Sequence, residues 1–248
     1  MPSNQFIATL ICITTLSFSG KTQFHKLFYH KLGTPQSVDA LVFGGEKTPR
    51  RYIGAFVTED QQYLIITAAV STSGNELYII SLKDSNAPIV NVIDNFEKEH
   101  QVVHSEGDWI FIYTTLNAPN GRLVKVKASN PAPENWTDVI SERKEPLSIS
   151  TGGGYFFASY LKDALSLVEQ VDLNGKVVRT ISLPGKGTAS GFSGKWKDPV
   201  LYFTFTSYTQ PATIYSLDVK SGKSSIYKES KVDFNPVDFE SRQVFYQS

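Results

Sequence analysis

The sequence is poor in helical signals, in cysteine and in charge of either sign. No long stretch places apolar residues at positions i, i+3, i+4 and i+7 between capping residues, which argues against helical bundles and alternating α/β folds. The single cysteine, Cys12, excludes an intramolecular disulfide and a cysteine-based zinc site. Lys and Arg total 24, Asp and Glu total 24, and the formal net charge is +0. The composition therefore gives no reason to expect nucleic acid or an anionic membrane as a partner.

Hydrophobic runs long enough to cross a bilayer are also missing. The mostly apolar run at residues 6–16 has 11 residues, too few for a membrane-spanning helix. Small residues at 17 and 19, followed by Gly20, favour a signal peptide over residues 1–20 with cleavage near Ser19. No Lys or Arg precedes the run, so a β-strand or an irregular start remains an alternative. The protein is periplasmic or secreted if residues 1–19 are a signal peptide, and cytoplasmic otherwise.

Short runs rich in β-branched and aromatic residues take the place of helices. Gly, Asn, Pro and Asp, which favour turns, separate these runs. Asn174-Gly175 and Ser221-Gly222 lie between paired runs, where hairpin turns need residues that tolerate positive φ. The predicted strands are 63–67, 77–82, 109–113, 123–126, 155–160, 177–183, 201–206 and 213–219.

The predicted strands recur with a regular period. Leu77, Leu123, Leu167 and Ile214 occupy matching places in similar segments, at spacings of 46, 44 and 47 residues. A period of about 40–50 residues with four strands per unit is typical of β-propeller blades. We predict an all-β fold with about four and a half four-stranded blades over residues 21–248; a sandwich or barrel with accidental spacing is the alternative. The complete units are expected at 51–96, 101–140, 146–183 and 187–229, after a two-stranded remnant at 25–44.

Several segments resemble the propeller of the prolyl oligopeptidase family. They are "LFYHKLGTPQS" from Leu27, "RYIGAFVTEDQQYLII" from Arg51, "NAPNGRLV" from Asn117, "FTSYTQPATIYSLD" from Phe205 and "FNPVDFESRQVFYQS" from Phe234. The resemblance implies a part of a seven-bladed propeller beside an α/β-hydrolase domain. In such serine-type endopeptidases the propeller restricts access to the catalytic cavity, so that short peptides are cut after proline. The implied partners are short proline-containing peptides, and no cofactor is implied.

The sequence departs from that family in two respects. The segment resembling "RQVFYQS" leads into the hydrolase domain in the family, whereas this chain stops at Ser248. We therefore expect a propeller fragment without the catalytic Ser, Asp and His, inactive alone. The family also has a substrate-contacting Arg in a loop after the second strand of one blade, but residues 68–72 here read Ala-Ala-Val-Ser-Thr. No substrate-binding residue is carried over.

The residues themselves predict no catalytic, metal or cofactor site. Ser190 and Ser193 lie in a glycine-rich stretch, but neither has glycine at both −2 and +2, as G-x-S-x-G requires. His100 and His104 are four residues apart, but the residues between them favour a strand over the helix of a zinc-binding H-E-x-x-H motif. We interpret the serine stretch as an inner propeller strand and both histidines as surface or hydrogen-bonded groups. Two glycine-rich segments, 152–154 and 185–188, do not fit a phosphate-binding loop and are interpreted as turns.

Three functions follow from these observations. The first is the gating propeller segment of a proline-specific serine endopeptidase. The second is a free-standing propeller module that binds a peptide or protein through the loops at its blade ends. The third, an independent enzyme on a propeller scaffold, is disfavoured because no nucleophile, base and acid are grouped. Uncovered blade faces and open strand edges also predict self-association.

Overall fold

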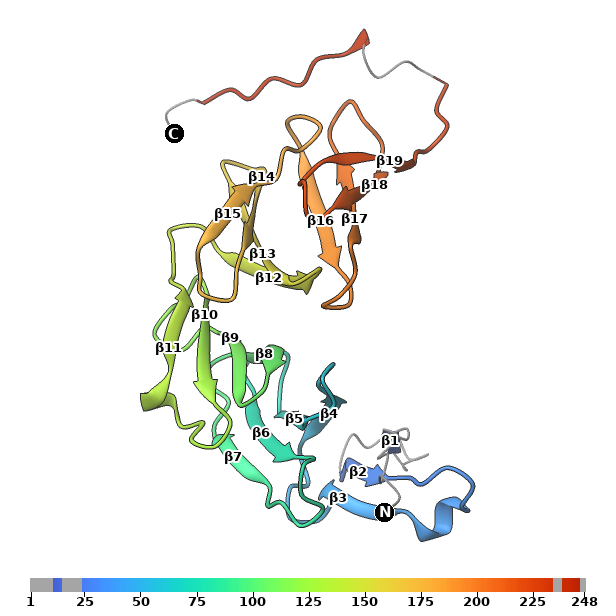
Figure 1. Ribbon diagram of the computed structural model, residues 1–248, viewed down its shortest axis with the longest axis vertical. Coiled ribbons are helices and arrows are strands. Elements are labelled where there is room, and N and C mark those ends of the chain that lie inside the picture. The colour runs from blue at the N-terminus through green and yellow to red at the C-terminus, as the bar shows by residue number, and fades with distance from the viewer. Residues whose placement is uncertain (1–10, 15–23, 234–237, 246–248) are drawn as a thin grey trace. The chain divides into compact units, whose positions relative to one another are not determined.

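The computed structural model describes residues 11–14, 24–233 and 238–245 (Figure 1). The chain forms two compact units, residues 1–117 with 124–137, and residues 118–123 with 138–248. Strands dominate both units, and the helices of the described part are two short 3-10 turns, η1 (Gln36–Val38) and η2 (Pro133–Asn135). The all-β prediction is therefore confirmed.

The first sheet contains the two strands predicted for residues 25–44 and one strand from earlier in the chain. Its order is β1 (Ile11–Thr14), β2 (Lys26–Tyr29) and β3 (Ala40–Gly44). Strand β1 pairs antiparallel with β2, Ile11 opposite Tyr29 and Thr14 opposite Lys26. The two strands predicted within 25–44 are confirmed as β2 and β3, and β1 adds a third strand from a segment outside that range. The signal-peptide interpretation of residues 1–20 falls largely outside the described residues and stays a prediction.

The second sheet has the order β4, β5, β6, β7 and belongs to the first unit. Its strands are β4 (Tyr52–Val57), β5 (Tyr63–Ala69), β6 (Glu76–Ser81) and β7 (Val90–Ile93). Apolar residues on both faces of β5 are buried, because neighbouring sheets cover it from either side. Leu64 and Ile66 pack with Leu27 of the first sheet, whereas Ile65 packs with Ile110 of the third sheet.

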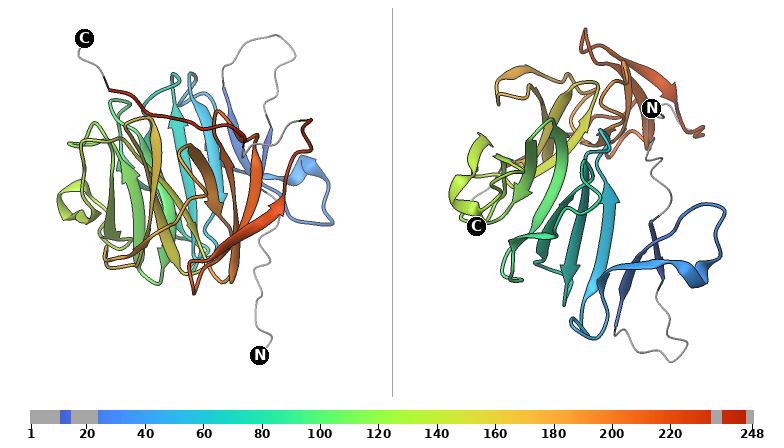
Figure 2. Two further views of the ribbon diagram at one scale, coloured as in Figure 1. Left: turned by 90° about the horizontal axis from the view of Figure 1, so that it is seen from above. Right: turned by 60° about the horizontal axis from the view of Figure 1, so that its bottom comes forward.

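The third sheet repeats this four-stranded pattern. Its strands are β8 (His100–Glu106), β9 (Trp109–Thr114), β10 (Arg122–Lys127) and β11 (Thr137–Ile140). A register shift between Val102 and His104 marks a bulge in the β8–β9 pair. Figure 2 gives two further views in which the strands of each sheet run side by side.

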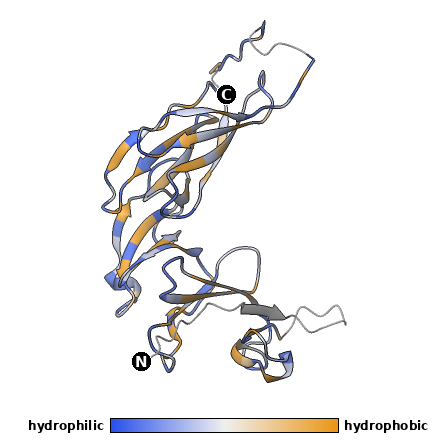
Figure 3. Ribbon diagram, turned by 45° about the vertical axis from the view of Figure 1, so that its right-hand side comes forward, coloured by the Kyte–Doolittle hydropathy of each residue, from blue (hydrophilic) through white to orange (hydrophobic). Residues whose placement is uncertain are grey.

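The second unit holds the last two sheets. The fourth consists of β12 (Leu147–Gly152), β13 (Tyr155–Lys162), β14 (Leu165–Val171) and β15 (Val177–Thr180). The fifth consists of β16 (Thr188–Ser193), β17 (Val200–Thr206), β18 (Thr213–Asp218) and β19 (Ser224–Lys228). Colouring by hydropathy shows apolar and polar positions alternating along several of these strands (Figure 3), as expected for strands whose side chains point to opposite faces.

Aromatic side chains fill the space between the fourth and fifth sheets. Phe203 lies 4.6 Å from Phe192 and 5.2 Å from Tyr215 between ring centroids, with nearly parallel planes. Phe157 of the fourth sheet stacks on Phe192 at 5.8 Å. Phe192 is fully buried with φ of 60°, beside a register shift between Gly191 and Ser193. The bulge therefore turns this ring into the core between the two sheets.

The glycine-containing turns form as predicted. Gly175 in the β14–β15 turn has φ of 85°, and Gly222 in the β18–β19 turn has φ of 73°. A Cβ on Gly175 would lie 2.0 Å from the Val139 carbonyl oxygen, so the position excludes any other residue by space as well as by conformation. The matching residues Leu77, Leu123, Leu167 and Ile214 all lie on the third strand of their sheets.

Candidate functional site

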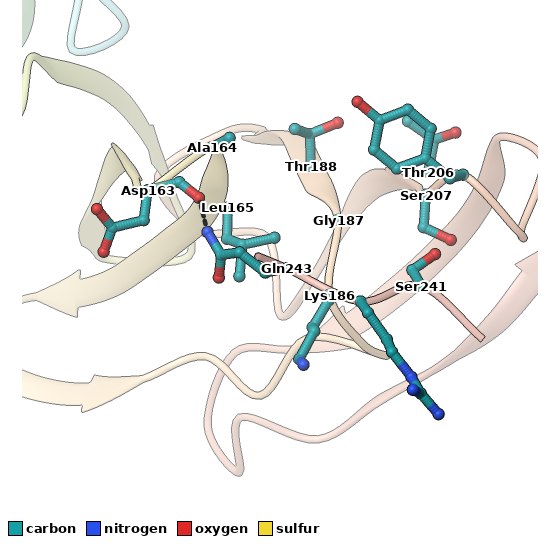
Figure 4. Close-up of a pocket in the computed structure, with 12 residues that line it drawn as sticks. Asp163, Ala164, Leu165, Lys186, Gly187, Thr188, Thr206, Ser207, Ser241 and Gln243 are labelled. Carbon is teal, nitrogen blue, oxygen red and sulfur yellow. Dashed lines mark hydrogen bonds between the residues drawn. The ribbon is translucent and has the colours of Figure 1, made fainter. Parts of the chain in front are cut away.

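A pocket of about 440 Å³ opens at one end of the two sheets of the second unit (Figure 4). We call it the Tyr208 pocket. Its size lies in the range of small-molecule and peptide sites, about 300–1,000 Å³. Three neighbouring loops and the segment 241–243 surround it. The lining residues are Asp163, Ala164, Leu165, Lys186, Gly187, Thr188, Thr206, Ser207, Tyr208, Ser241, Arg242 and Gln243.

The β13–β14 turn forms one wall of the Tyr208 pocket in a strained conformation. Asp163 and Ala164 have φ of 50° and 61°. A two-residue hairpin turn of this hand normally carries Asn-Gly or Asp-Gly, because a Cβ disfavours the left-handed region. The Asp163 carbonyl oxygen accepts a hydrogen bond from Gln243 Nε2. This contact fixes the turn to the segment that crosses the pocket.

Gly187 allows the β15–β16 connection to lie directly against β17. A Cβ at this position would lie 2.2 Å from the Thr206 carbonyl oxygen. The carbonyl of Gly187 accepts a hydrogen bond from the Ser166 amide at 3.0 Å, and the Ala189 amide donates to Ser166 Oγ at 2.9 Å. These bonds tie the floor of the pocket to both sheets of the unit.

The β17–β18 loop carries Tyr208 on a firmly hydrogen-bonded backbone. The Ser207 amide donates to the Gln210 carbonyl at 3.0 Å, and the Gln210 amide donates back to Ser207 Oγ at 3.0 Å. Gln210 Nε2 also donates to the hydroxyl oxygen of Tyr215 at 2.9 Å. Tyr208 itself is fully exposed. A rigid loop thus presents an aromatic ring to solvent at the pocket rim.

Charged groups at the Tyr208 pocket differ in their partners. Arg242 forms an ion pair with Glu240 at 2.8 Å, in which both side chains are exposed. Lys186 is exposed and makes no hydrogen bond or ion pair within the described part of the chain. In Figure 4 the Asp163 carboxylate points away from the other labelled side chains. In the same view the Lys186 side chain also points away from Thr188 and Ser207.

A second pocket, of about 340 Å³, lies in the first unit. We call it the Asn75 pocket. Asn75 Nδ2 donates to the His100 carbonyl and its Oδ1 accepts from the His100 amide, both at 3.0 Å. Burial lowers the pKa of His100 to about 4, so this imidazole is neutral at physiological pH. Ser71 and Thr72, from the stretch where the related family has an Arg, also line this pocket.

The two pockets occupy equivalent places in the repeat. Each is lined by the loop from the second to the third strand of one sheet, by the start of the first strand of the next sheet, and by the end of that sheet's second strand. In the first unit these parts are the β5–β6 loop, the start of β8 and the end of β9. In the second unit they are the β13–β14 turn, the start of β16 and the end of β17. This end of the sheets is therefore the candidate binding face within each unit.

Of the serine and histidine residues singled out from the sequence, His100 lines the Asn75 pocket, whereas Ser190, Ser193 and His104 line neither pocket. Ser190 pairs with Thr204 and Ser193 with Tyr202 inside the fifth sheet, which confirms the strand interpretation. His100 and His104 lie on β8, as predicted. His100 Nδ1 lies 2.9 Å from Thr114 Oγ1, and burial lowers the pKa of His104 to about 4. Sequence reasoning interpreted the segment 185–188, three residues of which line the Tyr208 pocket, as a turn only. It missed Tyr208 and Gln243; an aromatic residue in a polar loop before Pro211 was the available signal for Tyr208.

Within residues 11–14, 24–233 and 238–245, no group of three or more His, Cys, Asp or Glu side chains is placed to hold a metal ion. In the same part of the chain, no helix has the length and apolar character needed to cross a membrane.

Repeated four-stranded antiparallel sheets, each packed on the next within its unit, define the chain as a β-propeller domain. Residues 13–230 match the family model described as the prolyl oligopeptidase N-terminal beta-propeller domain. The chain belongs to this family, as the sequence resemblance indicated.

Relatives and solved structures agree with this assignment. The chain is 51% identical over 230 residues to the prolyl endopeptidase of Elizabethkingia miricola, covering 93% of this chain and 32% of the relative. It is 29% identical over 245 residues to the prolyl endopeptidase of Dictyostelium discoideum, covering 90% and 32%. A structure from a study of two prolyl endopeptidases and their inter-domain dynamics superposes with a TM-score of 0.83 at 31% identity, covering 94% of this chain and 35% of that one. The chain thus spans about a third of the length of its relatives.

Proposed function

We propose that this chain forms the propeller part of a prolyl oligopeptidase-type serine endopeptidase and restricts the access of peptides to the catalytic centre. Short proline-containing peptides are then the substrates of the whole enzyme. The match of residues 13–230 to the family's propeller, together with 51% identity to a prolyl endopeptidase, carries the proposal. The two equivalent pockets support it, because they place ligand-sized openings at the same end of the sheets in each unit.

A chimera tests this proposal directly. Residues 13–230 replace the matching third of the Elizabethkingia miricola enzyme, and the purified chimera is offered a short Gly-Pro reporter peptide and an unfolded, proline-rich protein. We expect cleavage of the short peptide and sparing of the protein, because only small substrates pass a propeller. The unmodified relative is the control. A folded chimera that cuts neither substrate, or cuts both at similar rates, would contradict the proposal.

A further inference from the structure

We infer that Asn174 is a site of spontaneous chemical modification, at which the side-chain amide is converted to a carboxylate through a cyclic imide. The backbone nitrogen of Gly175 forms a bond to Cγ of Asn174, the Cγ–Nδ2 bond breaks, and Nδ2 leaves as ammonia with the proton that Gly175 gives up. Water then opens the ring at either carbonyl. The products are aspartate, or isoaspartate with an extra methylene group in the backbone. The inference is independent of the proposed function.

The sequence contains two Asn-Gly steps, Asn120-Gly121 and Asn174-Gly175. Asparagine is a thermolabile residue, and a following glycine favours ring closure because its amide has no Cβ beside it. Both steps end the same kind of turn. The glycine amide donates to the carbonyl three residues earlier, at 2.8 Å for Gly121 and 3.0 Å for Gly175, and the two φ angles are 83° and 85°. A difference in reactivity therefore depends on the surroundings of each turn.

The first step is held by hydrogen bonds on all sides of Asn120. Its Nδ2 donates to the carbonyl oxygens of Arg143 and Lys144, both at 3.1 Å. Its backbone amide donates to Glu142 Oε1 at 2.6 Å, and its carbonyl accepts from the Leu147 amide at 2.7 Å. Ring closure would break the two side-chain bonds, because Cγ must turn toward the next amide and Nδ2 must leave. The structure therefore protects this step.

The second step lies at an open edge of the fourth sheet. Asn174 is exposed, and within the described residues its side-chain amide makes no hydrogen bond. The strand that follows, β15, has four residues, is mostly exposed, and pairs only with β14 across a register shift. Such short edges open locally at a small part of the free energy of global unfolding. Opening releases the Gly175 amide from the Asp172 carbonyl and allows it to react.

The product does not fit the native turn. A Cβ on Gly175 would lie 2.0 Å from the Val139 carbonyl oxygen, so the longer backbone of isoaspartate has no room without a shift of the turn. The new carboxylate also lies two residues from Asp172, whose Oδ1 accepts from the amides of Asn174 and Lys176. Like charges at this distance repel. We therefore expect the modification to loosen the turn and β15.

Ageing of the full 248-residue chain in mildly alkaline buffer, folded and in urea, tests the inference. Mass spectrometry of peptides measures amide loss at each step, and methylation by a protein-isoaspartate methyltransferase measures isoaspartate. In the folded chain Asn174 should react at least about tenfold faster than Asn120, which requires a difference of only about 1.4 kcal/mol in local opening free energy. In urea the two rates should converge, because the surroundings that distinguish the two steps are lost.

Matched variants identify the source of the isoaspartate. Asn174→Gln should remove most of it, because glutamine would have to close a larger ring, whereas Asn120→Gln should leave the yield unchanged. Circular dichroism checks that each variant is folded. Hydrogen exchange of the β15 amides should become faster on ageing in the parent chain but not in Asn174→Gln. The inference is overturned if both steps react equally fast in the folded chain, if Asn174→Gln yields as much isoaspartate as the parent, or if ageing leaves the exchange of β15 unchanged.

Discussion

Acid should destabilise the first unit through His100 and His104. Both imidazoles lie on β8 and have a pKa of about 4, lowered by burial from 6.5. For His104 the nearby Asp60 carboxylate opposes this shift. Because the folded-state pKa lies below the unfolded-state value, the unfolded chain binds protons first. The contribution of the neutral imidazoles to the unfolding free energy is therefore complete above pH 6.5, and it is lost as the pH falls from 6.5 to 4.

The size of the effect follows from the shift. A pKa change of one unit corresponds to about 1.4 kcal/mol, so His100, which is 3% exposed, accounts for about 3 kcal/mol at most. His104 is only half-buried, and solvent screening reduces its share. Most of the His100 contribution should disappear by about pH 4.5, half a unit above its folded pKa.

Urea unfolding between pH 7 and pH 4.5 measures this loss. His100→Gln keeps a hydrogen-bond partner for the Thr114 hydroxyl, which lies 2.9 Å from His100 Nδ1, and removes the titrating group. Between pH 7 and pH 4.5 the unfolding free energy of this variant should fall by about 2 kcal/mol less than that of the parent chain. Carboxylates titrate in both proteins and cancel in the difference, provided that the urea m-values agree. Equal pH slopes for the variant and the parent chain would refute the reasoning.

Four further outcomes are expected. Phe203→Ala should cost about 3–5 kcal/mol, because it opens a cavity in the aromatic stack between the fourth and fifth sheets; a shift in urea midpoint worth less than about 1 kcal/mol would contradict that role. Gly175→Ala should destabilise the chain by more than about 1 kcal/mol, whereas Gly185→Ala, which meets nothing within 4 Å, should be nearly neutral in the same thermal melt. The purified chain should not cleave a Gly-Pro reporter above the buffer rate, since the 248 residues contain no G-x-S-x-G motif. Light scattering should reveal association as concentration rises, driven by the exposed Tyr202 and Tyr227 and the open edge of β19; a monodisperse 27.6 kDa species at every concentration would count against it.

The strands were predictable because their signal is local. Alternating apolar residues and turn residues placed β5, β9 and β17 within two residues of their observed bounds. The β14–β15 and β18–β19 turns followed from Asn174-Gly175 and Ser221-Gly222 in the same way. The predicted strand at 177–183 ends earlier, at Thr180, yet Ile181 remains buried in the core. An apolar pattern thus marks burial even where the hydrogen-bonded ladder has ended.

The pockets could not be predicted because each one gathers residues from distant parts of the chain. Asp163, Tyr208 and Gln243 meet at one opening although 80 residues separate the first from the last. Nor did any local pattern indicate that Asp163-Ala164 would adopt a left-handed turn, since Ala disfavours that conformation. Tyr208 follows strand β17, in which Phe203 and Phe205 are buried and Tyr202 is exposed, so the aromatic pattern of the sequence did not indicate the exposure of Tyr208.

The repeat explains why the same pocket forms twice with different chemistry. Four strands per blade fix where the second strand ends and where the next first strand begins, so an opening arises at the same place in each unit. The loops that line it are exposed and tolerate different residues without disturbing the sheets. In the first unit they supply Asn75, whose two hydrogen bonds to His100 close the β5–β6 loop onto β8. In the second they supply Lys186 and Tyr208, both of which are exposed. The repeat determines where such openings form, and the loop residues determine the chemistry of their lining.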